Sequence, residues 1–196
     1  MIYSFDGSPS PVHTSRSSGG MLQTGSGLSD AEIQRLRDFG DTLDTTNVKL
    51  FGRSDAERVL ATGSRFDRCE ETEWLYQLMA ERIQQINAEF FGYDLTCFAE
   101  TFYYLSYGPG EHFNWHVDAG SKLSAPRKLS MVVQLSDPSE YEGGEFDVLE
   151  AVDYARADRV KGLAMVFPAY KIHRVTPVTR GKRRTLAIFA CGPSFR

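Results

Sequence analysis

Apolar residues recur every three or four positions early in the chain, the spacing that places them on one face of a helix. Ile33, Leu36 and Leu43 form this stripe. The stretch Ser29-Asp-Ala-Glu32 precedes it and matches a capping box, in which two side chains bond the free backbone amides of a first helical turn. We therefore predict a helix over residues 29–41.

A longer stripe with the same spacing runs over residues 71–91 and stops at Gly92, a residue type that commonly ends helices. We predict a second helix here, with its apolar side packed against a sheet. Between the two helices the pattern indicates no more than a strand over residues 48–52. The apolar positions of the second stripe are Trp74, Leu75, Leu78, Met79, Ile83, Ile86 and Phe90.

Beyond Gly92 the apolar spacing changes from helical to alternating, which is typical of strands with one buried face. Turns that contain glycine or proline separate most of these segments. Short strands without helices between them favour an antiparallel sandwich or barrel, and the preceding helices make it an α+β domain. The predicted strands cover residues 97–106, 112–117, 128–136, 145–149, 163–167, 173–178 and 184–191.

Composition suggests where the domain begins. Residues 1–27 are rich in Ser, Gly and Pro, so we expect a loosely ordered segment there, with no more than a short strand over residues 1–5. Residues 28–196 then form one domain, with helical support over 28–92 and a barrel core over 97–191.

Charge and cysteine content exclude some classes of protein. The net charge of −4 gives no electrostatic reason to expect binding to nucleic acid or to an anionic membrane. No apolar run reaches the roughly 20 residues of a membrane-spanning helix, and no secretory signal is evident. The three cysteines are widely spaced, as in a reduced protein rather than a disulfide frame. We therefore expect a cytoplasmic protein without a membrane partner.

The candidate chemistry starts at His116 and Asp118. Side chains two apart in a strand point to the same face, so this imidazole and this carboxylate can meet one metal ion. His112 points the same way in a regular strand and is a rival ligand. A third donor has to come from another strand, and His173 is the one histidine further along the chain.

Two imidazoles and one carboxylate suit non-haem Fe(II), because three adjacent coordination positions stay open for a co-substrate and O₂. A structural zinc site takes four protein ligands, usually thiolates, and the cysteines are placed wrongly for it. Arg183 follows His173 by ten residues across a short turn, so both side chains can reach one cavity. A guanidinium at the closed end of such a cavity would pair with a carboxylate.

Together these residues resemble the 2-oxoglutarate- and Fe(II)-dependent dioxygenases, and in particular their prolyl 4-hydroxylase-like branch. The resemblance covers residues 97–196 and rests on the order and spacing of several short motifs. The family implies a double-stranded β-helix, a jelly-roll barrel that holds iron at its open mouth. The motifs are Tyr107-Gly-Pro-Gly110, His116-Val-Asp118, Arg127-Lys-Leu-Ser130, Gln134-Leu-Ser-Asp137, Tyr141-Glu-Gly-Gly-Glu145, Phe167-Pro168, His173-Arg-Val-Thr-Pro-Val178, Gly181 and Cys191-Gly-Pro-Ser-Phe-Arg196.

The resemblance also implies roles for single residues. His116, Asp118 and His173 correspond to the iron ligands of the family. Arg183 corresponds to the residue that binds the distal carboxylate of 2-oxoglutarate, and Tyr107 to a tyrosine that often bonds the same group. The implied cofactors are Fe(II), with 2-oxoglutarate and O₂ as co-substrates and ascorbate as a reductant.

Two positions depart from the family pattern. Gln134 stands where relatives often carry a co-substrate-contacting tyrosine, and Phe113 also stands where some relatives have tyrosine. Gln134 is accordingly a further candidate contact to 2-oxoglutarate. Near the expected mouth, Trp115, Asn114 and His112 are candidate contacts to the substrate.

The implied reaction is hydroxylation of a C–H bond, first of all on a prolyl or other amino-acid residue of a protein, with release of succinate and CO₂. The same iron chemistry also serves free amino acids, small metabolites and modified bases. Two alternatives come from other classes: a non-enzymatic cupin-like metal binder, which needs neither Arg183 nor Tyr107, and a zinc hydrolase, which would act without O₂.

Overall fold

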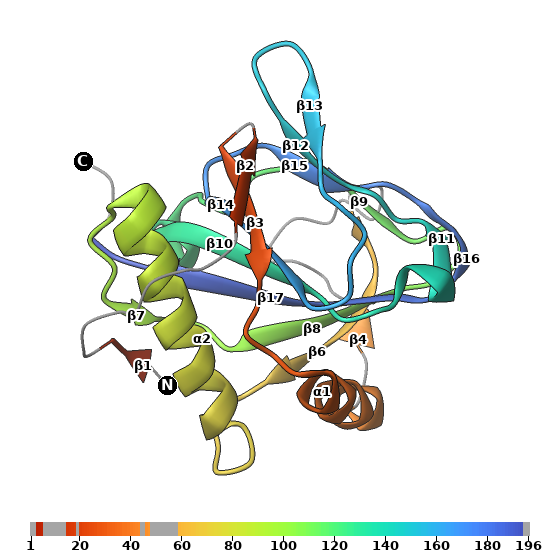
Figure 1. The fold of residues 1–196 in the computed structure, drawn as a ribbon, viewed down its shortest axis with the longest axis horizontal. Helices are drawn as coiled ribbons and strands as arrows, with labels where there is room; N and C mark the ends of the chain where they lie inside the picture. The colour runs from red at the N-terminus through yellow and green to blue at the C-terminus, as the bar shows by residue number, and fades with distance from the viewer. Residues whose placement is uncertain (1–2, 6–14, 19, 44–45, 48–58, 194–196) are drawn as a thin grey trace.

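The computed structural model describes residues 3–5, 15–18, 20–43, 46–47 and 59–193. In this part of the chain two antiparallel sheets enclose an apolar interior, and two helices pack on the larger sheet from its other side (Figure 1). This architecture confirms the α+β jelly roll expected from the sequence.

In the described residues the larger sheet has ten strands. β1 (Tyr3–Ser4) pairs with β7 (Cys97–Phe98), and β7 pairs with the end of β17. The main path of the sheet runs, in order, through β2 (Ser15–Ser18), β3 (Met21–Gly25), β14 (Leu163–Pro168), β10 (Arg127–Gln134), β17 (Arg183–Cys191), β8 (Phe102–Tyr107), β6 (Thr62–Phe66) and β4 (Thr46–Asn47).

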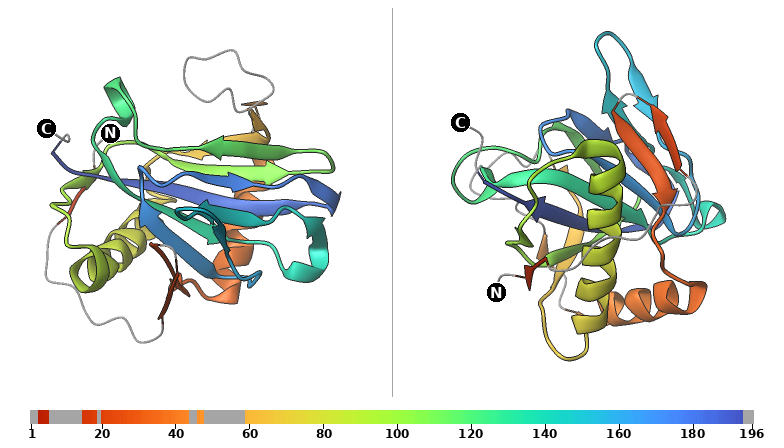
Figure 2. Two further views of the ribbon diagram at one scale, coloured as in Figure 1. Left: turned by 90° about the horizontal axis from the view of Figure 1, so that it is seen from above. Right: turned by 60° about the vertical axis from the view of Figure 1, so that its left-hand side comes forward.

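The smaller sheet has five strands in the described part of the chain, and its β12–β13 hairpin projects from the end of the molecule opposite α1 (Figure 2). Two short 3₁₀ turns, Lys122–Ser124 and Pro138–Glu140, lie in the connections. A separate two-stranded sheet joins β11 (Tyr141–Gly143) to β16 (Val178–Gly181). The order in the smaller sheet is β13 (Tyr154–Arg156), β12 (Phe146–Leu149), β15 (His173–Val175), β9 (His112–His116) and β5 (Val59–Leu60).

Alternation along β17 divides its side chains between two compartments, because successive residues of a strand point to opposite faces. The even-numbered residues over 186–190 face the helices and join the main core. The odd-numbered residues face a pocket between the two sheets. These are Arg183, Thr185, Ala187 and Phe189. The same strand therefore anchors the helices and builds the site.

The helices begin as the sequence predicts. In α1 (Asp30–Thr42) the Ser29 hydroxyl accepts a hydrogen bond from the Glu32 amide at 3.3 Å, and the Glu32 carboxylate accepts one from the Ser29 amide at 2.8 Å. The second helix, α2 (Glu73–Ile86), buries Ile83 completely. Burial of such a side chain contributes about 1.5–3 kcal/mol, so the apolar stripe holds α2 on the sheet.

The second helix ends earlier than predicted. After Ile86 the chain forms a π-helical turn (Asn87–Phe91), which Gly92 closes at φ 68° while its amide donates to the Asn87 carbonyl at 2.7 Å. The wider turn shifts the helical phase. The expectation that Phe90 belongs to the buried stripe is wrong, since Phe90 is 41% exposed.

The N-terminal segment also differs from expectation. β3 (Met21–Gly25) falls within the stretch that we expected to be loosely ordered, yet it pairs with β14 and buries Met21 and Leu22. Its order comes from pairing with a distant strand, which local composition does not report. The strand predicted over residues 48–52 lies outside the described residues.

Strand boundaries account for the remaining differences. The predicted strand over 97–106 is divided into β7 and β8, and the one over 173–178 is divided into β15 and β16. The short strands β11 and β13, and β6 between the helices, were not predicted. Each is stabilised mainly by cross-strand partners, so its sequence carries little pattern of its own.

Candidate active site

Three potential metal ligands converge where β9 ends and β15 begins. His116 and His173 are direct partners in the register between these strands, and Asp118 follows β9 by two residues. His116 Nε2 lies 3.6 Å from Asp118 Oδ1, and His173 Nε2 lies 3.4 Å from Asp118 Oδ2. One ligand atom from each residue lies within 4.8 Å of the others, so a single ion could bind all three.

Hydrogen bonds to the backbone orient both imidazoles. His116 Nδ1 lies 2.8 Å from the Asn114 carbonyl oxygen, and His173 Nδ1 lies 3.0 Å from the Lys171 carbonyl oxygen. A carbonyl can only accept, so each Nδ1 donates and each Nε2 is the ring nitrogen directed toward Asp118. This is the arrangement in which backbone partners fix the tautomer of a metal-binding histidine.

Asp118 is held as a carboxylate. Ser130 Oγ donates to Asp118 Oδ2 at 2.6 Å, and the Asp118 amide donates to the Ala169 carbonyl at 2.9 Å. Burial alone raises the pKa of Asp118, but the two imidazoles and the Ser130 hydroxyl outweigh it and hold the pKa below its usual value. The site therefore presents a negative charge to a cation.

A buried ion pair supports this part of the site, and the sequence had assigned it no role. Arg127 donates to both carboxylate oxygens of Glu100 at 2.6 Å and to the Asp118 carbonyl at 3.1 Å. Its guanidinium also lies 3.7 Å from the ring centre of Phe189. Ser130 and Arg127 both fall in a motif that carried the resemblance, but only the packing shows what each of them contacts.

A β-bulge in β9 decides between the rival histidines. His173 pairs with His116 and Val175 with Phe113, so between these pairs two residues of β9 oppose one of β15. The extra residue shifts the alternation, and Phe113 stacks on the His116 ring at a centroid distance of 3.4 Å. His112 is consequently on the other side, where its Nδ1 lies 3.1 Å from the Gly110 carbonyl oxygen, and it takes no part in the ligand cluster.

The metal ligands open into a pocket between the two sheets, about 560 Å³ including its mouth. Most of its walls are apolar, and only a few polar groups reach it. The other lining residues are Tyr103, Leu105, Tyr107, Phe113, Val132, Phe146, Val175, Arg183, Thr185, Ala187 and Phe189. Thr185, which the sequence did not single out, follows Arg183 by two residues on the same face of β17.

Arg183 is a buried cation that forms no ion pair with the described part of the chain. It is only 2% exposed, and its Nε and Nη1 atoms have no hydrogen-bond partner among the described residues. Tyr107 lies opposite it in the register between β8 and β17, with the guanidinium carbon 5.7 Å from the ring centre. Burial raises the pKa of Tyr107 to about 12, against the influence of Arg183, so the phenol keeps its proton at neutral pH and can donate.

The other candidate residues lie elsewhere. Gln134 is buried in a neighbouring cavity, where its amide donates to Tyr141 Oη at 3.0 Å. Trp115 packs under Arg174, whose guanidinium lies 4.4 Å from the indole centre. Neither Trp115 nor Asn114 nor His112 lines the pocket that holds the ligands, and their role as substrate contacts stays a prediction.

The residues present fit the cofactor and co-substrate that the resemblance implies. Two Nε2 atoms and one carboxylate form the facial set that leaves coordination positions open on Fe(II). The unpaired guanidinium of Arg183 suits a carboxylate at the other end of the pocket, because a buried cation without a partner is costly. In the part of the chain that the structure describes, no helix combines the length and apolar character that a bilayer crossing requires.

Comparison with other proteins points the same way. Residues 102–191 match the family model for the 2OG-Fe(II) oxygenase superfamily. A PKHD-type hydroxylase of Burkholderia cenocepacia is 30% identical over 172 residues, which cover 83% of this chain and 74% of the relative. A PKHD-type hydroxylase of a Janthinobacterium strain is 40% identical over 83 residues, which cover 39% of this chain and 37% of the relative. The match thus spans little more than a third of that second relative.

Two solved structures share the fold. A prolyl-4-hydroxylase of Pseudomonas putida has a TM-score of 0.71 and 18% identity over 90% of this chain and 95% of its own. A prolyl hydroxylase of Trichoplax adhaerens, in complex with a hypoxia inducible factor peptide fragment, has a TM-score of 0.72 and 15% identity, with 89% and 84% coverage. With the ligand geometry and the Burkholderia relative, they lead to one conclusion: the chain belongs to the 2-oxoglutarate- and Fe(II)-dependent oxygenases, in their prolyl 4-hydroxylase-like branch.

Proposed function

We propose that the protein hydroxylates a C–H bond with Fe(II), 2-oxoglutarate and O₂, and that succinate and CO₂ are released. The observation that carries this proposal is the pairing of a metal-ligand set with an unpaired buried guanidinium in one pocket. A simple metal binder has no need for Arg183, since a buried cation without a partner lowers stability. The arrangement favours an oxygenase over a cupin-like binding protein.

The chain contributes binding and orientation to this reaction. His116, Asp118 and His173 would hold Fe(II), which supplies the activation of O₂ for attack on a C–H bond. Arg183 and Tyr107 would bind the distal carboxylate of 2-oxoglutarate and direct its other end toward the metal. The apolar walls would exclude water from the reacting groups, which limits side reactions.

We propose a residue of a protein or peptide as the substrate, with proline the first choice. The support is the likeness to prolyl hydroxylases, one of which was solved with a peptide fragment. The same iron chemistry on a free amino acid, a small metabolite or a modified base is the second candidate. The pocket is lined by aromatic side chains as well as by a few polar groups, so it can accept a partly polar substrate.

The first test is production of succinate from 2-oxoglutarate by the purified protein with Fe(II), ascorbate and O₂. The expected result is turnover that stops without O₂ and that Zn(II) does not support. Peptide libraries and cell extract incubated in the same way should then show a gain of one oxygen by mass spectrometry. Iron binding without any loss of 2-oxoglutarate, under every substrate condition, would overturn the proposal.

A further inference from the structure

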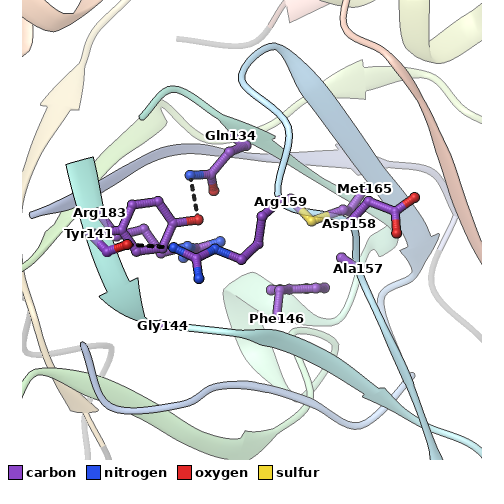
Figure 3. A pocket seen from close by; sticks show the side chains of 9 residues that line it. All are labelled: Gln134, Tyr141, Gly144, Phe146, Ala157, Asp158, Arg159, Met165 and Arg183. Atoms are coloured by element: carbon purple, nitrogen blue, oxygen red, sulfur yellow. Dashed lines mark hydrogen bonds between the residues drawn. The ribbon is translucent and has the colours of Figure 1, made fainter. Parts of the chain in front are cut away.

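A second, smaller cavity adjoins the pocket at Arg183 and Phe146, which line both spaces. It has room for about one water molecule. Figure 3 shows Gln134, Tyr141, Arg159 and Arg183 converging on one side of this cavity. Among the described residues of the lining, Asp158 is the one acidic residue, and its carboxylate is directed away from the two guanidinium groups (Figure 3).

The hydrogen bonds of Gln134 determine which way the Tyr141 hydroxyl is turned. Gln134 Nε2 lies 3.2 Å from the Ser136 carbonyl oxygen and 3.0 Å from Tyr141 Oη. The carbonyl can only accept, so the amide nitrogen, not its oxygen, faces both groups. The amide therefore donates to the phenol oxygen, and the phenol proton remains free to donate elsewhere.

Arg159 fixes the ring of Tyr141 in this position. Its guanidinium lies 4.2 Å from the ring centre, and Nη2 donates to the Tyr141 carbonyl at 2.5 Å and to the Pro138 carbonyl at 3.2 Å. Nη1 lies 3.6 Å from Glu145, while Nε is buried without a hydrogen-bond partner. Tyr141 itself is 2% exposed, so the hydroxyl has little freedom to turn toward solvent.

Gly144 allows Arg183 to lie beside this cavity. A Cβ atom at Gly144 would stand 2.9 Å from Arg183 Cδ and 2.9 Å from Val178 Cγ2, which is closer than real Cβ atoms come. The backbone there also has φ +63°, which favours glycine. The missing side chain thus leaves the space in which the Cδ methylene of Arg183 lies.

Among the described residues, the groups around this cavity that lack an acceptor are all donors: the Tyr141 hydroxyl, the Nε atom of Arg159, and the Nε and Nη1 atoms of Arg183. Buried donors without acceptors are unfavourable, so an anion that supplies the acceptors would complete the site. The space has room for about one oxygen atom beside Arg183, which also lines the main pocket.

We propose that Tyr141, turned by Gln134, is a further donor to the distal carboxylate of the co-substrate, beside Arg183 and Tyr107, and sets the preference for a dicarboxylate. This inference rests on the proposed function, because it takes 2-oxoglutarate as the occupant of the pocket. Gln134 then acts as a positioning residue that does not touch the co-substrate. The hydroxyl of Tyr141 then takes the place of the tyrosine hydroxyl that relatives often carry at the position of Gln134.

The test is calorimetric titration of the protein loaded with Mn(II) under anaerobic conditions, so that binding is measured without turnover. The ligands are 2-oxoglutarate and 2-oxopentanoate, which has the same chain length but no distal carboxylate. In Tyr141→Phe the Kd for 2-oxoglutarate should rise about tenfold or more, as for a hydrogen bond to a charged group. The Kd for 2-oxopentanoate should change less than twofold.

Two further variants separate this role from a general loss of packing. Tyr104→Phe also removes a buried hydroxyl, bonded to Asp41 at 2.7 Å on the helix side of the sheet, and should leave both Kd values unchanged. Gln134→Leu keeps the Tyr141 hydroxyl but frees its rotation. The Kd for 2-oxoglutarate should rise by a smaller factor than in Tyr141→Phe, and the Kd for 2-oxopentanoate should not change.

The outcomes distinguish the two proposals. Equal affinity of Tyr141→Phe and the unchanged protein for 2-oxoglutarate would overturn the role of Tyr141 and leave the proposed function intact. A parallel loss for both ligands would also overturn it, since a purely structural effect does not depend on the distal carboxylate. If the Mn(II)-loaded protein binds neither ligand in any variant, the proposed function fails as well.

Discussion

The two ends of the pocket satisfy their polar groups in opposite ways. At the metal end, both imidazole Nδ1 atoms donate to backbone carbonyls and Asp118 accepts from Ser130, so hydrogen bonds within the protein orient all three potential ligands. At the closed end, Arg183 is equally buried but leaves Nε and Nη1 without partners. One end is held by the protein alone, and the other is completed only by a ligand.

The difference shows what each end is built to bind. A metal site needs ligands fixed in advance, because the open ion imposes strict geometry on them. A carboxylate site can leave its donors free, since a bidentate guanidinium already matches the anion. The unpaired donors of the closed end therefore lower the stability of the empty protein but increase its affinity for a carboxylate. The potential metal ligands, by contrast, are held by hydrogen bonds that exist without the ion.

The largest expected effect comes from removal of a metal ligand. His173→Ala should weaken Fe(II) binding by more than the roughly 10–100-fold that loss of an outer hydrogen-bond partner costs. The fold should persist, because β15 keeps its strand partners. Equilibrium dialysis against Fe(II) under nitrogen measures the effect. Full iron affinity in this variant would remove His173 from the ligand set.

Arg183→Met should weaken 2-oxoglutarate binding but stabilise the ligand-free protein. The Kd for 2-oxoglutarate should rise about 10–100-fold, while the affinity for the metal is unchanged. The free energy of unfolding of the ligand-free protein should rise by about 1–4 kcal/mol, because an unpaired buried cation is replaced by an apolar side chain. Urea unfolding and calorimetry measure both. A loss of stability would show that the guanidinium has a partner in the empty protein.

Loss of the hydrogen bond from Ser130 to the Asp118 carboxylate should have a smaller effect on metal affinity. Ser130→Ala removes the 2.6 Å hydrogen bond to Asp118 and should weaken metal binding by about tenfold. The affinity of the metal-loaded protein for 2-oxoglutarate should hardly change. Ser64→Ala is the matched control, since the Ser64 hydroxyl is buried and has no partner among the described residues. Equal losses in both variants would contradict the role of Ser130.

The smallest effect should come from His112→Ala. The bulge in β9 turns this residue away from the ligands, so metal affinity should stay within about twofold of the unchanged protein. The same dialysis measurement checks it. A loss as large as that of His173→Ala would mean that β9 is regular and that His112 is a ligand.

Much of the fold follows from apolar spacing, because burial of one face is a local property of a helix or strand. The capping box at Ser29, the apolar stripe of α2 and most strands of the jelly roll are found this way. The short strand β3 is not, because its order depends on β14, more than a hundred residues away. The π-helical turn that exposes Phe90 likewise cannot be recognised from the spacing of the apolar residues.

The same distinction holds within the site. The sequence by itself determined the ligand types and their spacing, His116, Asp118 and His173, and it pointed to Arg183 as a partner for a carboxylate. These are properties of residue type and strand alternation, which the chain carries locally.

Only the tertiary structure separated His112 from the ligand cluster, showed that Arg183 has donors without partners among the described residues, and placed the Gln134 amide against the Tyr141 hydroxyl. Each depends on a β-bulge, on burial or on a hydrogen bond between elements. Such features arise from how distant segments pair, and no local pattern of residues specifies them.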